Sequence, residues 1–284
     1  MTAIRTDIHN EVFGTGGDGS LFAQLRGAGL RPVLRLTGIA VWTGGLFVML
    51  VTGMWAATPW QRARLWWRNL VVRRWARGVA WLFGMRMRQR GRPPVAPFFL
   101  VSNHLSYLDI ILILGHLDGV FVAKRELSQW PILGYLTRLV GTIFLDRTRQ
   151  RDAHRALDRI DARIALGDGV VAFPEGTSSG GDDVYPMRAA LFEWAAANNR
   201  PVHVATLSYS TGDPAVPARE RVCWWGDMPF LPHAVELLRL KGFEASIHFA
   251  AEPLTGTDRG RLAAEARNLI AANFVPTDRG LEPV

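Results

Sequence analysis

From about residue 96 onward, the apolar and polar positions follow two periodicities, that of buried strands and that of helices. Short apolar runs of the kind that form buried strands recur there, and stretches with helical spacing separate most of them. The seven predicted strands cover residues 97–103, 119–124, 141–146, 169–176, 201–209, 221–226 and 245–254. The predicted helices cover residues 106–117, 131–139, 152–166, 188–198, 232–240 and 258–274. This alternation predicts an α/β fold with a mostly parallel central sheet of about seven strands flanked by helices.

The segment 36–57 has a different pattern, because none of its 22 residues is charged. About 20 apolar residues are enough for a helix to cross the hydrocarbon core of a bilayer. A cleavable signal peptide has a shorter apolar region closer to the N-terminus, so we expect an N-terminal membrane-associated helix here. Four glycines within the segment leave open whether it spans the bilayer or lies shallow in it.

The next segment, 59–92, contains ten arginines and five tryptophans but no acidic residue. Helical spacing places Trp67 and Trp75 on one apolar face, which we expect to contact lipid. The arginines expected to reach headgroup phosphates are Arg64, Arg68, Arg73 and Arg77. Basic segments rich in aromatics also bind nucleic acid, but the adjacent apolar run favours the lipid bilayer, so no nucleic-acid partner is expected. An arginine excess after a spanning segment further predicts an inner-membrane protein whose remaining chain faces the cytoplasm.

Length and composition fit one main domain with an appendage that binds the membrane. The 284 residues are 49% hydrophobic and 20% charged, and the net charge of +8 points to anionic partners. The single cysteine, Cys223, excludes an intrachain disulfide and is expected to be buried. We expect a mobile N-terminal tail at 1–35, membrane-anchoring helices at 36–92, a catalytic domain at 95–275 and a C-terminal tail at 276–284.

Candidate chemistry lies where predicted strands end, because open α/β sheets place their active sites there. Asn103 and His104 directly follow the strand predicted at 97–103, and Asp109 lies in the first turns of the next helix. A carboxylate in that position can accept the proton of one imidazole nitrogen and leave the other nitrogen free as a base. The spacing alone is weak evidence, since such pairs also arise by chance.

A second polar cluster ends the strand predicted at 169–176. Glu175, Gly176 and Thr177 would face the same edge of the sheet, and glycine allows a ligand to approach the backbone closely. The structural alternative is a glutamate that caps the next helix. No paired histidines occur at the spacing of a zinc helix, so no metal and no cofactor are expected.

These residues stand in four ordered blocks that resemble motifs of the 1-acylglycerol-3-phosphate acyltransferase family. NHLSYLD (103–109) is similar to its N-H-x-x-x-x-D motif, and FPEGTSS (173–179) is similar to its F-P-E-G-T motif. Between them, FVAKRELSQWPILG (121–134) resembles the K-x-E-L and P-x-x-G segment, and GTIFLDR (141–147) resembles the G-x-x-F-hydrophobic-D-R block. The resemblance covers roughly residues 95–255.

The resemblance implies acyl transfer from acyl-CoA or acyl carrier protein, as the co-substrate, to the hydroxyl of a lysolipid acceptor. It implies that His104 takes the proton of that hydroxyl and that Asp109 supports the imidazolium, without a covalent acyl-enzyme. Substrate-binding positions are expected at Asn103, Lys124, Arg147, Glu175, Gly176, Thr177, Ser178 and Arg188. Lys124 and Arg147 match basic positions that could hold a phosphate, although surface ion pairs are an alternative for both.

Departures from the family pattern concern the acceptor. Many family members have arginine after F-P-E-G-T, whereas this chain has Ser178, and Arg188 could replace a lysine that is usual downstream. We expect 1-acylglycerol-3-phosphate as the acceptor, with a lyso-ornithine lipid as the alternative. The segment 223–238 resembles a feature of that wider branch, and its His233 is expected to be structural.

Two other classes of protein remain open from the sequence. A hydrolase or metal enzyme would use His104, Asp109 and Glu175 but would need further ligands at metal spacing. A non-catalytic membrane-binding protein would need only the basic helix, and the FPEGT block would then have no purpose.

Overall fold

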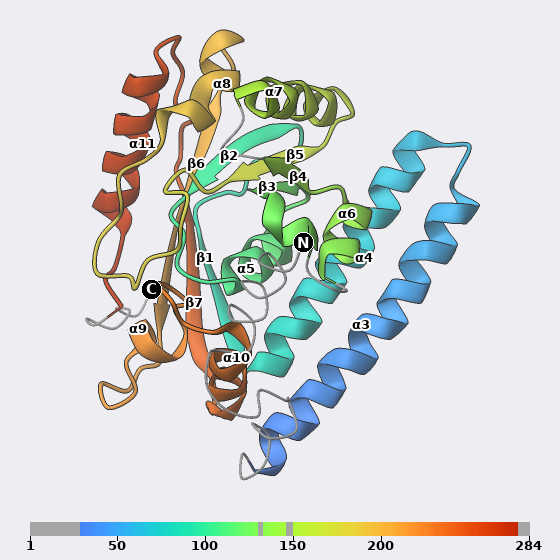
Figure 1. Cartoon of the computed structure of the whole chain (residues 1–284), viewed down its shortest axis with the longest axis vertical. Helices are drawn as coiled ribbons and strands as arrows, with labels where there is room; N and C mark the ends of the chain where they lie inside the picture. Colours follow the sequence, from blue (N-terminus) through green and yellow to red (C-terminus); the bar gives the residue numbers. More distant parts are fainter. Residues whose placement is uncertain (1–28, 130–132, 146–149, 278–284) are drawn as a thin grey trace.

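A seven-stranded sheet forms the centre of the computed structural model, which describes residues 29–129, 133–145 and 150–277. The strand order is β1-β7-β6-β2-β5-β3-β4, and helices cover both faces of the sheet (Figure 1). Neighbouring strands are parallel except for β6 and β7, which are antiparallel. The predicted α/β class with a mostly parallel sheet is confirmed.

The strands are β1 (Met85–Arg90), β2 (Phe98–Ser102), β3 (Val120–Lys124), β4 (Ile143–Leu145), β5 (Gly169–Ala172), β6 (Val202–Ser210) and β7 (Phe243–Phe249). The helices are α3 (Leu30–Ala56), α4 (Gln61–Phe83), α5 (Leu108–His116), α6 (Leu133–Val140), α7 (Gln150–Ala165), α8 (Glu193–Ala197), α9 (Ala218–Arg221), α10 (Phe230–Arg239) and α11 (Arg259–Asn273). Two 3-10 helices, η1 (Arg125–Gln129) and η2 (Ala189–Phe192), complete the described elements. Every strand except β1 coincides with a predicted strand.

Two apolar cores lie on opposite faces of the sheet. One joins the sheet to α4, α5 and α10 and includes Phe83 and Leu112. The other joins the sheet to α7, α8 and α11 and includes Ile160 and Ile270. Strand β2 is buried along its whole length between these cores, which explains its uninterrupted apolar sequence. The end of β2, where the candidate site begins, is therefore held by a rigid frame.

The edge strand β1 corrects the predicted boundary of the basic helix. Helix α4 ends at Phe83, and the rest of the arginine-rich segment pairs in parallel with β7. Met85 is buried and Met87 half-buried, while the arginines between and after them are exposed. The alternation of methionine and arginine is the period of a strand with one face on the core. The high arginine content of the segment led the sequence prediction to miss this strand pattern.

The strand predicted at 221–226 is wrong. Its amides bond locally or to the candidate site, because Cys223 N donates to Ala218 O and Trp224 N donates to Leu105 O, both at 2.9 Å. Cys223 is buried, as expected. An apolar run of this length is ambiguous, and here its side chains fill the space between α9 and the loop after β2.

Helices α3 and α4 run side by side along one flank of the domain (Figure 1). By length and composition, α3 is the one helix within the described residues that could cross a membrane. Three indole nitrogens join the pair: Trp67 Nε1 donates to Met49 O at 3.0 Å, Trp75 Nε1 donates to Thr43 Oγ1 at 3.1 Å, and Trp42 Nε1 donates to Trp75 O at 3.3 Å. Because α4 also packs on α5 and the core, the basic helix belongs to the domain and is not a separate anchor.

Parts of both predicted tails are built into the fold. Helix α3 begins six residues before position 36, and Arg35 Nη1 donates to two carbonyls at the C-terminal end of α10, at 3.0 and 2.7 Å. At the other end, Thr277 is buried and its hydroxyl donates to Gly180 O at 3.0 Å. The remaining predicted tail residues, 1–28 and 278–284, lie outside the described residues.

Candidate active site

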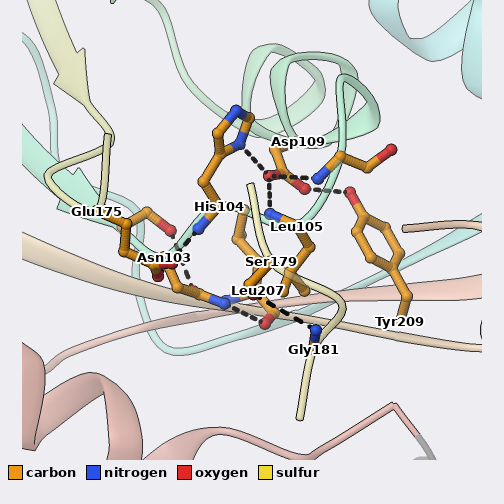
Figure 2. A network of polar contacts seen from close by, with 11 residues as sticks. Asn103, His104, Leu105, Asp109, Glu175, Ser179, Gly181, Leu207 and Tyr209 are labelled. Atoms are coloured by element: carbon orange, nitrogen blue, oxygen red, sulfur yellow. Dashed lines mark hydrogen bonds and ion pairs between the residues drawn. The ribbon is translucent and has the colours of Figure 1, made fainter. Parts of the chain in front are cut away.

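Asn103 fixes the loop that carries the candidate base. Its Nδ2 donates to Leu207 O at 2.9 Å, and its Oδ1 accepts from Leu207 N at 2.8 Å, so the side chain is clamped to β6 (Figure 2). The residue is also buried. Both ends of the carboxamide are used within the protein, so Asn103 is not the substrate contact expected from the sequence. It positions His104 instead.

His104 and Asp109 meet directly, as their spacing suggested. His104 Nδ1 lies 2.6 Å from Asp109 Oδ2 (Figure 2). The imidazole side chain is 21% exposed, whereas the carboxylate is fully buried. An ionised carboxylate can only accept, so the proton of the neutral ring lies on Nδ1 and Nε2 keeps its lone pair. This geometry can remove a proton from a hydroxyl that reaches Nε2.

Asp109 receives three hydrogen bonds besides that of the imidazole. Its Oδ2 accepts from Leu105 N at 2.7 Å and from Ser106 N at 3.1 Å, and its Oδ1 accepts from Tyr209 Oη at 2.7 Å. Burial, reinforced by the Asp109 charge, raises the pKa of Tyr209 well above its usual value, so the phenol remains a donor. Tyr209 was not expected as a site residue. The β6 sequence predicts a buried strand, and nothing in it indicates that the Tyr209 hydroxyl bonds to Asp109.

Aromatic stacking fixes the plane of the imidazole. The His104 ring lies parallel to the ring of Phe173, with centroids 4.2 Å apart and planes at 16°. Phe121 also stacks on Phe173, at 5.8 Å and 15°. The base is therefore oriented by a carboxylate at its edge and by a phenyl ring on its face. The sequence marked Phe173 only as the first letter of a motif.

Glu175 lies against the backbone of the base. Its Oε1 accepts from His104 N at 3.3 Å, and its Oε2 has no hydrogen-bond partner among the described residues. Burial raises the pKa of Glu175 to about 8, so the carboxyl is mainly protonated at neutral pH and can donate a hydrogen bond. The alternative role as a helix cap is wrong, because the next helical segment begins only at Ala189.

The FPEGT loop turns back toward the loop that carries His104. Gly176 has a φ of 79°, a left-handed conformation that glycine adopts without strain. Three residues later, Ser179 N donates to His104 O at 2.9 Å. Thr177 is exposed and Ser178 half-buried, so both are accessible to a ligand. The two predicted clusters therefore form one site.

The predicted basic positions are more dispersed. Lys124 is exposed at the end of β3, which lies two strands from β2. Arg188 is exposed, and its amide donates to Pro174 O at 2.9 Å, which holds it beside the FPEGT loop. Arg147 lies outside the described residues.

Only part of the predicted membrane set is accessible. Arg64 and Arg77 are exposed on α4. Arg68 is only 5% exposed and its Nη2 lies 2.7 Å from Asp168 Oδ1, so its assignment to a headgroup is wrong. Arg73 is half-buried and its Nη2 lies 2.5 Å from Asp118 Oδ1.

Trp67 and Trp75 are also placed differently from the expectation, because both are half-buried against α3. The tryptophans that are exposed on the helix pair are Trp42, Trp55, Trp60, Trp66 and Trp81. The face predicted to contact lipid is thus a helix interface, and other aromatics of the same two helices are open to the surroundings.

No group of three or more His, Cys, Asp or Glu side chains in the described ranges could hold a metal ion. His233 is buried, and its Nδ1 lies 3.2 Å from Tyr107 Oη. Burial lowers the pKa of His233 to about 4. A neutral histidine held in this way fits the structural role expected for it.

Known proteins are similar to this chain in sequence and in fold. The model of a family described as Acyltransferase matches residues 86–210. A lyso-ornithine lipid O-acyltransferase of Rhizobium meliloti is 36% identical over 194 residues, which are 64% of this chain and 66% of that protein. One of Brucella abortus is 33% identical over 220 residues, 72% of this chain and 82% of that protein. A 1-acyl-sn-glycerol-3-phosphate acyltransferase of Neisseria meningitidis is 32% identical over 145 residues, 50% of this chain and 56% of that protein.

Among solved structures, the 1-acyl-sn-glycerophosphate acyltransferase of Thermotoga maritima is similar in fold. The TM-score is 0.60 at 18% identity, and the match covers 86% of this chain and 96% of that one. At this identity the likeness concerns the fold alone. It extends the similarity beyond the residues that the family model matches.

Proposed function

Because the chain belongs to the acyltransferase family and is a lysolipid O-acyltransferase, we propose that it acylates the hydroxyl of a lyso-ornithine lipid with a fatty acyl group from a thioester. Acyl-CoA and acyl carrier protein are the candidate donors. Two relatives with lyso-ornithine acceptors match a larger share of the chain than a relative with a glycerophosphate acceptor. Ser178 points the same way, since a lyso-ornithine lipid carries no phosphate that would require arginine there.

The reaction would use His104 as the general base. Nε2 takes the proton of the acceptor hydroxyl while the hydroxyl oxygen attacks the thioester carbonyl. The new C–O bond forms, the C–S bond breaks, and the leaving thiolate takes the proton back from Nε2. Asp109 keeps the ring in the required tautomer and stabilises the transient imidazolium. No residue of the enzyme is acylated in this sequence.

One observation carries this proposal more than any other. The 2.6 Å contact between His104 and Asp109 leaves Nε2 free on a ring that is partly exposed, while the carboxylate is fully enclosed by donors. A merely structural histidine needs no such arrangement. Glu175 and the accessible hydroxyls of Thr177 and Ser178 lie on the adjoining loop, where an acceptor headgroup would bind.

We further propose that α3 lies in one leaflet of the inner membrane and does not cross it, with the catalytic domain in the cytoplasm. The start of α3 is tied to α10 through Arg35, and its middle is tied to α4 through Trp67 and Trp75. To span the bilayer, α3 would have to leave α4 or draw that arginine-rich helix into the hydrocarbon. Its exposed apolar side chains instead suit one-sided immersion.

Site-specific labelling tests this topology. Cysteine at Leu30, the exposed first residue of α3, should resist a membrane-impermeant maleimide added from the periplasmic side, whereas a spanning α3 would place it on that side because the chain after α3 stays in the cytoplasm. The one natural cysteine is buried and gives a low background. Rapid labelling from the periplasmic side would mean that α3 spans.

A substrate panel tests the reaction and the acceptor together. Purified enzyme would be incubated with palmitoyl-CoA or palmitoyl carrier protein and with lyso-ornithine lipid or 1-acylglycerol-3-phosphate, and mass spectrometry would identify the products. We expect ornithine lipid as the main product, and His104→Ala as the inactive control. Faster acylation of 1-acylglycerol-3-phosphate would overturn the acceptor, and release of free fatty acid alone would indicate a hydrolase.

A further inference from the structure

A second polar concavity lies away from the His104 site, at the β4 edge of the sheet. Its volume is about 230 Å³, and four of its six lining residues are arginines. The lining residues are Arg125, Ser128, Arg138, Phe144, Arg155 and Arg159, and we call this set the arginine pocket. All four arginines are exposed, and none of the described lining residues is acidic. Four guanidinium groups this close together favour a bound anion, since the like charges otherwise repel one another.

Three separate elements bring the arginines together. Arg125 begins η1, Arg138 lies on α6, and the other two lie on α7. Arg159 Nη1 donates to Phe144 O at 3.3 Å, which directs this guanidinium toward the edge of β4. Figure 1 shows α6 and α7 flanking that edge. Guanidinium groups that converge from several directions suit a phosphate, whose oxygens accept paired hydrogen bonds.

The arginine pocket lies within reach of the candidate active site. The strand register places Phe144 of β4 level with Ser102 at the end of β2. Three strand spacings separate β2 from β4 in the sheet, which amounts to roughly 14 Å. An extended pantetheine arm has the reach of four to five residues, roughly 15 Å. A thioester at His104 could therefore have the phosphate of its arm in the pocket.

We propose that the arginine pocket binds the phosphate of the phosphopantetheine arm of the acyl donor. This inference rests on the proposed function, in which the lyso-ornithine acceptor has no phosphate and the donor does. Coenzyme A and acyl carrier protein share this phosphopantetheine phosphate, so the pocket serves either carrier. The phosphate anchors the arm while its thioester end extends along the sheet edge toward His104.

Donor analogues separate this role from other uses of the pocket. Initial rates would be measured with palmitoyl-CoA, palmitoyl carrier protein and palmitoyl-pantetheine, which lacks every phosphate. Arg138→Gln with Arg159→Gln should raise the KM for a phosphorylated donor about tenfold, as expected for lost charge-assisted hydrogen bonds. The KM for palmitoyl-pantetheine should stay unchanged. The carrier whose KM rises is the source of the phosphate.

A matched control removes the same charge elsewhere. Arg90 and Arg92 are exposed at β1, the opposite edge of the sheet, and Arg90→Gln with Arg92→Gln should leave every KM unchanged. An equal rise in KM for palmitoyl-pantetheine would overturn the proposal. A rise confined to the KM of the acceptor, or weaker vesicle binding with unchanged donor KM, would overturn it as well, in favour of a headgroup site.

Direct binding makes the inference independent of turnover. Calorimetric titration of detergent-solubilised enzyme with CoA, carrier protein and pantetheine should show weaker binding of a phosphorylated carrier to the double variant, and no change with pantetheine. If wild-type enzyme acylates a lysolipid but the variant binds both carriers normally, the pocket assignment fails and the function stands. If no lysolipid is acylated but carrier binding depends on these arginines, the function fails and the pocket assignment stands.

Discussion

Asp109 and Asp168 are both fully buried carboxylates with a nitrogen partner close by, yet their surroundings differ. Asp109 accepts four hydrogen bonds, and its imidazole partner is partly exposed. Asp168 Oδ1 lies 2.7 Å from the buried Arg68, and Oδ2 has no hydrogen-bond partner in the described part of the chain. Arg68 also donates to Val140 O at 3.3 Å, so this pair ties α4 to the strands beside it.

Burial and pairing alone therefore do not identify a carboxylate of an active site. At Asp109 the buried carboxylate holds an imidazole whose Nε2 keeps a free lone pair. Because this ring is partly exposed, a hydroxyl can reach the lone pair, as proton transfer requires. At Asp168 the neighbour is a guanidinium, which has no lone pair to offer and stays protonated. The first arrangement is expected to affect the rate, and the second only the stability.

The largest effect is expected from His104→Ala. Removal of a general base slows reactions by 10²–10⁴-fold, and we expect about a 1000-fold loss of kcat here. The free energy of unfolding should fall by only about 2 kcal/mol, because Asp109 loses one donor and keeps the other three. Rates on lyso-ornithine lipid and urea unfolding would be measured on the same preparation. Activity above a few per cent of wild type would exclude His104 as the base.

Arg68→Met should lower the free energy of unfolding strongly and change kcat little. It leaves Asp168 buried without its closest partner, and breaking a buried pair in this way costs about 3–5 kcal/mol of unfolding free energy. The kcat of the remaining folded enzyme should stay within about twofold of wild type, since the pair is remote from Nε2. Urea unfolding and active-enzyme titration would measure both quantities.

A matched double variant sharpens that test. Arg68→Met combined with Asp168→Leu replaces both charges by apolar groups, so it should recover most of the lost stability. If the double variant is as unstable as the single one, packing and not the unpaired charge is responsible.

The sequence predicted the sheet and the contact between His104 and Asp109 for related reasons. Buried strands such as β2 are continuous apolar runs, and polar residues at their ends are conspicuous, so His104, Asp109 and Glu175 could be found from local pattern. Contacts between distant segments leave no such pattern. Tyr209 follows Asp109 by 100 positions, and Arg68 precedes Asp168 by the same interval.

The same limit explains the errors in the membrane region. Arginine and tryptophan at helical spacing have the same appearance whether a helix faces lipid or a second helix. Only the position of α3 shows that Trp67 donates to Met49 O, and that α4 has one side on the domain. The residue types of this region could be interpreted from the sequence, but the residues that their side chains contact could not.

Tyr209→Phe tests the support of Asp109 without touching the base. The variant removes one donor and leaves Asp109 Oδ1 buried without it, which should cost about 2 kcal/mol of unfolding free energy. We expect a loss of kcat of about threefold to tenfold, because the carboxylate keeps three donors and remains ionised. Thermal unfolding and steady-state rates check this. A loss as large as that of His104→Ala would mean that Tyr209 takes part in the reaction itself.

Glu175→Gln extends the comparison to a third buried carboxylate. Glu175 Oε2 has no hydrogen-bond partner among the described residues, and burial raises the pKa of the carboxyl to about 8. The folded protein thus favours the protonated carboxyl, so its contribution to stability is complete below the usual pKa and is lost as the pH rises toward 8.

Relative to Glu175→Gln, the wild-type free energy of unfolding should therefore fall by at most about 1.4 kcal/mol per pH unit across this interval and level off above it. Urea unfolding of both proteins at several pH values between 5 and 9 measures the difference. A difference that does not vary with pH would mean that Glu175 is ionised in the folded protein throughout. It would then resemble Asp109, with donors beyond the His104 amide, and could not donate a hydrogen bond to the acceptor.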